Sequence, residues 1–82
     1  MSQFGEFTPV YTSDFRERKV RLASIIQSGM NQYYIEVYFF RDKTRYVLHE
    51  TRLLNVHTFM SIDSAARLLR QHFVRPINVI LL

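Results

Sequence analysis

The sequence predicts an α+β fold: an antiparallel β-meander of three to five strands, one C-terminal amphipathic helix packed on one sheet face, and a short final strand. Three observations lead to this prediction. Apolar and polar residues alternate over three segments between residues 19 and 52, which is typical of half-buried strands. Apolar residues then recur at helical spacing after Ser61. A short apolar run follows Pro76.

The length and composition predict one folded domain. A chain of 82 residues has enough apolar side chains for one core, and two glycines and two prolines leave little room for flexible linkers. Residues 1–15 show no clear period, and we expect them to form an irregular N-terminal arm, with a short strand near residues 8–12 as an alternative. Residues 16–82 are expected to form the single α+β domain.

The three strands of the meander are separated by polar breaks. Residues 19–27 alternate in polarity, and residues 28–31 supply a glycine and an asparagine for a turn with positive φ. Residues 32–40 give the strongest strand signal, because they are rich in β-branched and aromatic side chains. Residues 41–44 form a second polar break, and residues 45–52 are predicted to form the third strand.

The C-terminal third predicts a helix and a strand. Residues 53–60 are ambiguous, since they fit either an extension of the third strand or a short fourth strand. Ser61 has the character of a helix N-cap, and Asp63 in the first turn complements the helix dipole. The helix must end before Pro76, and residues 77–82 are predicted to form the final strand. The apolar helix positions are Ile62, Ala65, Ala66, Leu69 and Phe73.

The loop centres predict which side chains share a sheet face. With Gly29-Met30 and Asp42-Lys43 as centres, directly opposed residues fall on the same face. The core face, which the helix would cover, is predicted to hold Val20, Leu22, Ile26, Tyr33, Ile35, Val37, Phe39, Tyr46 and Leu48. The opposite face is predicted to hold Lys19, Arg21, Ala23, Ile25, Tyr34, Glu36, Tyr38, Phe40, Arg45, Val47, His49 and Thr51.

The opposite face suggests a nucleic-acid-binding surface. Tyr38 is expected opposite Arg21, and Phe40 opposite Lys19, and aromatic rings interleaved with cations suit unpaired bases and phosphates. The net charge of +4, with nine Arg among eleven basic residues, favours a polyanionic partner. The candidate nucleic-acid-binding residues are Lys19, Arg21 and Arg45 for phosphates, Tyr34, Tyr38 and Phe40 for stacking, and His49 on the same face.

Two alternatives remain open at this stage. Glu36 lies within the candidate surface and would repel a phosphate, and the same residues suit a protein partner or self-association into a homodimer. An apolar terminal strand also favours a homo-oligomer, because it needs an edge to pair with. The second alternative uses the helix for duplex phosphates, through Arg67, Arg70 and Arg75, but no preceding helix completes a helix-turn-helix.

The residue pattern argues against catalysis, metals and membranes. The chain has no cysteine, and His49, His57 and His72 stand in no compact ligand spacing. No nucleophile elbow, phosphate-binding glycine loop or carboxylate pair is visible, so we expect a non-enzymatic protein without catalytic residues, metal or cofactor. No secretory signal or membrane span is expected, which makes a cytoplasmic location the default prediction.

Overall fold

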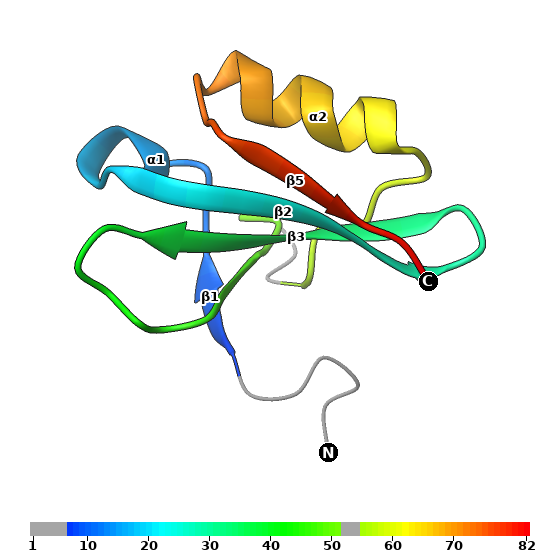
Figure 1. The fold of residues 1–82 in the computed structure, drawn as a ribbon, viewed down its shortest axis with the longest axis horizontal. Helices are drawn as coiled ribbons and strands as arrows, with labels where there is room; N and C mark the ends of the chain where they lie inside the picture. Colours follow the sequence, from blue (N-terminus) through cyan, green and yellow to red (C-terminus); the bar gives the residue numbers. More distant parts are fainter. Residues whose placement is uncertain (1–6, 52–54) are drawn as a thin grey trace.

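One five-stranded sheet and a long helix form the α+β fold that the sequence predicts (Figure 1). The computed structural model describes residues 7–51 and 55–82. The strands lie in the order β1-β4-β3-β2-β5. In chain order, the elements are β1 (Thr8–Val10), α1 (Asp14–Glu17), β2 (Val20–Gly29), β3 (Gln32–Phe39), β4 (Tyr46–Leu48), α2 (Ile62–Gln71) and β5 (Ile77–Ile80).

The sheet is mixed, whereas the sequence predicts an antiparallel one. The β2-β3-β4 meander is antiparallel as expected, but β1 pairs parallel with β4, and β5 pairs parallel with β2. The reason lies in the connections. Since α2 carries the chain back along the sheet between β4 and β5, the final strand runs in the same direction as β4, as crossover connections require.

The hydrophobic core lies between α2 and the face of β2 and β3 that it covers. Ser61 is the N-cap of α2, and its Oγ accepts a hydrogen bond from the N–H of Ser64 at 3.1 Å, as its sequence position predicts. The helix presents Ala65 and Leu69 to the sheet, both fully buried. The other core residues are Val10, Ala23, Ile25, Ile35, Val37, Phe39, Leu48, Phe59 and Val74.

The predicted faces of β3 and β4 are correct, but part of β2 is reversed. Ala23 and Ile25, expected on the open face, are 0% exposed in the core. Leu22 and Ile26, expected in the core, pair with Tyr38 and Tyr34 on the other face.

Two β-bulges explain the reversal. The β2–β3 pairing shifts by one residue between Val20 and Leu22, and again between Gln27 and Gly29. A shift of one residue moves every side chain in the intervening stretch to the opposite face. The β3–β4 pairing differs from the predicted one by two residues, with Val37 opposite Tyr46, and this shift leaves the faces unchanged.

The ambiguous segment before α2 does not form a regular strand in residues 55–60, and residues 52–54 lie outside the described part of the chain. Two isolated bridges join this segment to the sheet, from Phe59 to Tyr33 and from Val56 to His49. Within residues 1–15, expected as an irregular arm, β1 lies where a short strand near residues 8–12 is the alternative expectation, and Asp14 and Phe15 form the first half of α1. In the described ranges, no helix combines the length and the apolar character needed to cross a membrane.

Candidate nucleic-acid interface

Two cation–ring pairs lie side by side where β2 begins and β3 ends. The Nζ of Lys19 is 5.2 Å from the centre of the Phe40 ring, and the Cζ of Arg21 is 5.6 Å from the centre of the Tyr38 ring. The N–H of Phe40 donates a 3.2 Å hydrogen bond to the Lys19 carbonyl, which holds the start of β2 and the end of β3 together. Lys19, Arg21 and Phe40 are exposed and Tyr38 is half-buried, so water and ligands reach this surface.

The bulge in β2 places Arg21 in this position. Val20 pairs with Phe39 and Leu22 pairs with Tyr38, so Arg21 is the additional residue between them. A bulged residue is not bound into the regular ladder, and bulges re-aim side chains at functional sites. The predicted pairing of Arg21 with Tyr38 is therefore wrong, since Leu22 takes that position, but the bulge still brings the Arg21 side chain over the Tyr38 ring.

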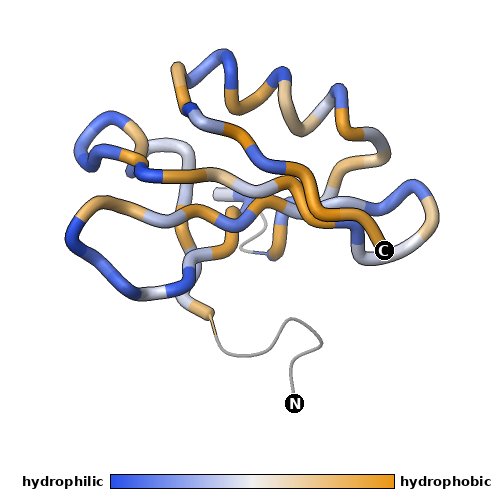
Figure 2. Tube along the Cα trace, viewed as in Figure 1, coloured by the Kyte–Doolittle hydropathy of each residue, from blue (hydrophilic) through white to orange (hydrophobic). Residues whose placement is uncertain are grey.

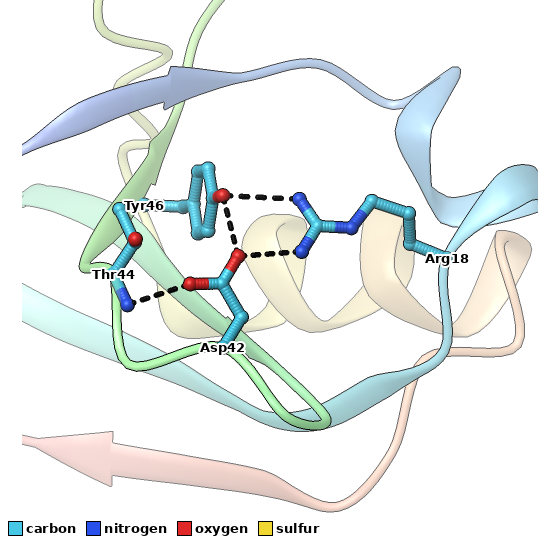
Figure 3. A network of polar contacts seen from close by, with 4 residues as sticks. All are labelled: Arg18, Asp42, Thr44 and Tyr46. Atoms are coloured by element: carbon cyan, nitrogen blue, oxygen red, sulfur yellow. Dashed lines mark hydrogen bonds and ion pairs between the residues drawn. The ribbon is translucent and has the colours of Figure 1, made fainter.

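A polar network holds the loop after β3 (Figure 3). The Asp42 carboxylate accepts hydrogen bonds from the Tyr46 hydroxyl at 2.7 Å, from Arg18 at 2.6 Å and from the N–H of Thr44 at 2.8 Å. Arg18 also donates to the Tyr46 hydroxyl at 3.0 Å, and its guanidinium lies 4.0 Å above the Phe39 ring. The loop is thereby attached to the chain just before β2.

The same network sets the charge of Asp42. Hydrogen bonds from Tyr46, Arg18 and Thr44, in that order of effect, hold the pKa of the Asp42 carboxyl well below its usual range. Bonds to Tyr46 and to Asp42 raise the pKa of Arg18. Asp42 is thus a carboxylate whose charge is already balanced by Arg18, and it presents little net negative charge to a ligand.

A shallow basic hollow results, which we call the Tyr38 hollow. Arg41 adopts a left-handed conformation with φ of 62°, a geometry found in tight turns. The side chains of Arg41 and Lys43 are exposed beside Tyr38. The sequence identifies this segment only as a polar break, although two cations flanking an aromatic strand end were the available signal. The hollow is lined by Arg21, Tyr38, Phe39, Arg41, Asp42 and Lys43.

A second polar cluster occupies the middle of the same face. Glu36 is 8% exposed. It forms an ion pair with Arg45 at 2.6 Å and accepts a 2.8 Å hydrogen bond from the Tyr38 hydroxyl. Burial, the largest single effect, acts to lower the pKa of Arg45, but the hydrogen bond and the charge of Glu36, together with Tyr34, outweigh it and the pKa rises. The hydrogen bond to Glu36 raises the pKa of Tyr38. Arg45 therefore offsets the repulsion that Glu36 would exert on a phosphate, and the charge of Arg45 is engaged in this ion pair.

Tyr34 and His49 lie inside the protein. Tyr34 is 7% exposed, and burial raises the pKa of its hydroxyl, which lies 3.4 Å from Arg45. His49 is 8% exposed, with its Nδ1 2.8 Å from the Val47 carbonyl and its ring 5.5 Å from that of Phe7. The structure therefore brings together Lys19, Arg21, Tyr38 and Phe40 at the surface, adds Arg41 and Lys43, and places Tyr34, Arg45 and His49 in supporting positions.

The three arginines of the alternative interpretation do not line the Tyr38 hollow. Arg67 and Arg70 of α2 and Arg75, which follows α2, are exposed. Arg70 and Arg75 line a separate apolar depression with Phe73 and Ile77, and Arg75 also lines a second hollow that includes Lys19. Within the described residues, no group of three or more His, Cys, Asp or Glu side chains is arranged to hold a metal ion. Comparison with known protein families, curated proteins and solved structures finds no match to this chain.

Proposed function

We propose that this chain is a non-catalytic module that binds single-stranded nucleic acid at the Tyr38 hollow and the adjoining Lys19–Phe40 pair. The observation that carries the proposal is the juxtaposition of two cation–ring pairs with Arg41 and Lys43, around a carboxylate already neutralised by Arg18. Cations for phosphates and rings for bases are the two components that such binding requires. Lys19, Arg21, Arg41 and Lys43 bind phosphates, and Tyr38 and Phe40 stack on bases.

Binding proceeds by exchange of partners on the rings. Without a ligand, each ring is in contact with a cation, an interaction worth about 0.5–1 kcal/mol at an exposed site. A stacked base contributes about 1–3 kcal/mol, and the displaced Arg21 or Lys19 gains a phosphate oxygen. The exchange is therefore favourable for both the ring and the cation. Single strands are preferred over duplexes because paired bases cannot reach the rings.

Fluorescence anisotropy with labelled single-stranded oligonucleotides tests the proposal. Arg21→Gln and Phe40→Ala are expected to weaken binding, the latter by about 1–3 kcal/mol. The matched controls are Arg67→Gln and Phe73→Ala, which make the same chemical changes at exposed positions outside the hollow. Equal losses in both pairs would show that only net charge and general hydrophobicity matter. Absence of binding by the unmodified chain at low salt would reject the proposal and favour the alternative, a protein partner on this face.

A further inference from the structure

The outer edge of β5 carries backbone groups without a strand partner among the described residues. β5 is the last strand of the sheet and is bonded on its inner side to β2, with Ala23 donating to the Pro76 carbonyl at 3.1 Å. In a parallel ladder, alternate residues bond to the neighbouring strand. The N–H and C=O groups of Ile77 and Val79 therefore point outward, where they can receive another strand.

The side chains along this edge are apolar and exposed. Val79 is 41%, Ile80 46% and Leu81 59% exposed, and no charged residue occurs in residues 76–82. Figure 2 shows this segment as mostly hydrophobic along the trace, and in the sequence Asn78 is the polar residue among residues 77–82. Exposed edge strands usually carry a charge, a bulge or a cover that prevents further pairing. Here the described chain provides none of these after Pro76.

We propose that a second copy of this chain binds here through antiparallel β5–β5 pairing centred on Val79. In this register Val79 opposes its own counterpart, Ile77 opposes Leu81, and Asn78 opposes Ile80. Ile77, Val79 and Leu81 have their outward backbone groups in hydrogen-bonded pairs. Because opposed residues share a face, core-side residues of one copy continue the core side of the other.

The chemistry of the edge favours a second copy over other partners. A strand paired with itself around a two-fold axis is self-complementary and closes as a dimer. The uncharged edge offers nothing to a polyanion, whereas it avoids repulsion between two copies that each carry a net charge of +4. The antiparallel register places the two Arg75 side chains at opposite ends, roughly 27 Å apart at about 3.4 Å per residue. That separation exceeds the screening length of about 8 Å in physiological salt.

Disulfide trapping tests the proposed pairing. The chain has no cysteine, so Val79→Cys introduces a single thiol. Opposed residues in a hydrogen-bonded pair have Cα atoms about 5.5 Å apart, within the range that a disulfide spans. Mild oxidation should convert most of the Val79→Cys protein to a covalent dimer. Met30→Cys, at a 90% exposed apolar position in the β2–β3 turn, is the matched control and should remain largely monomeric.

Sedimentation and hydrogen exchange on the unmodified chain complete the test without nucleic acid, so their outcome is independent of the proposed function. We expect a discrete dimer at micromolar concentrations and amide protection of Ile77 and Val79 that increases with protein concentration. Equal cross-linking of Val79→Cys and Met30→Cys would overturn the proposal. A monomer at high micromolar concentration would also overturn it, as would a dimer in which the Ile77 and Val79 amides exchange like those of exposed loops.

Discussion

At Asp42 a single carboxylate connects the loop after β3 to Arg18, before β2, and to Tyr46 of β4. We predict that Asp42→Asn destabilises the fold at neutral pH, because the ion pair is lost and the hydrogen bonds weaken. The folded-state pKa of Asp42 is lowered, so its stabilising contribution is complete above the unfolded pKa of about 3.9 and is lost progressively as the pH falls from there through the lower folded-state pKa. Thermal unfolding from pH 7 to pH 2 measures this.

The difference in melting temperature between the two proteins should therefore be largest near neutral pH and shrink below about pH 4. Glu17→Gln removes the same charge from an exposed residue of α1 and serves as the control. A difference in melting temperature between Asp42→Asn and the parent that stays constant across this pH range would show that the carboxylate charge does not stabilise the loop.

At the scale of elements, α2 depends on its first turn. Ser61 supplies the cap that satisfies the Ser64 N–H, and a helix of this length has few other means of satisfying its free N–H groups. We predict that Ser61→Ala lowers the free energy of unfolding by about 1 kcal/mol. Ser61→Asp should retain near-native stability, because aspartate also caps and complements the helix dipole. Urea denaturation distinguishes the two, and equal destabilisation by both variants would contradict a capping role.

Elements with a local signal were predicted correctly from the sequence. The cap, the helical spacing of Ile62, Ala65, Ala66 and Leu69, and the positive φ of 52° at Asn31 depend on neighbours in the chain. Two details were wrong. Phe73, predicted to continue the apolar face, lies beyond α2 and is 87% exposed, and the turn centres on Met30-Asn31 and not on Gly29-Met30, since Gly29 pairs with Gln32. The β2 faces were not predictable in the same way. Ala23, Ser24, Ile25 and Ile26 give little alternation, and a bulge depends on the partner strand, which leaves no periodic trace in one segment.

The candidate site was predictable in part for the same reason. The association of Lys19 with Phe40 follows from the hairpin, which the sequence indicates, whereas the position of Arg21 over Tyr38 depends on the bulge. The burial of His49 depends on Phe7 and on β1, which are distant from it in sequence. The pairing of Arg45 with Glu36 likewise requires two strands to be placed side by side. Such contacts are set by tertiary packing and carry no local signature.

At the scale of the whole molecule, charge and stacking predict how binding responds to salt. Four cations, namely Lys19, Arg21, Arg41 and Lys43, are proposed to bind phosphates. At about −0.7 per cation, the logarithm of the binding constant should fall with the logarithm of the salt concentration with a slope of about −3 for single strands. Affinity should then fall roughly 50-fold between about 50 and 200 mM salt, and Arg21→Gln should reduce the slope by about 0.7. Anisotropy titrations over this range measure both slopes. Affinity that hardly changes with salt would contradict phosphate binding.

The proposed pairing of two copies would increase the affinity for a long single strand. Antiparallel β5–β5 pairing continues each sheet face across the two-fold axis, so both α2 helices would cover one face and both Tyr38 hollows would open toward the other. One long strand could then contact both hollows, and the second contact would form at a high effective concentration.

The bulge at Arg21 determines how the site would respond to the loss of one codon. If the codon for Arg21 were deleted in frame, Val20 and Leu22 would follow one another opposite Phe39 and Tyr38, and the ladder would run without interruption as far as the second bulge, between Gln27 and Gly29. Every core side chain would keep its face, and only the cation over Tyr38 would be lost. Insertion or removal of one codon can therefore switch a ligand-facing charge on or off without the replacement of any core residue.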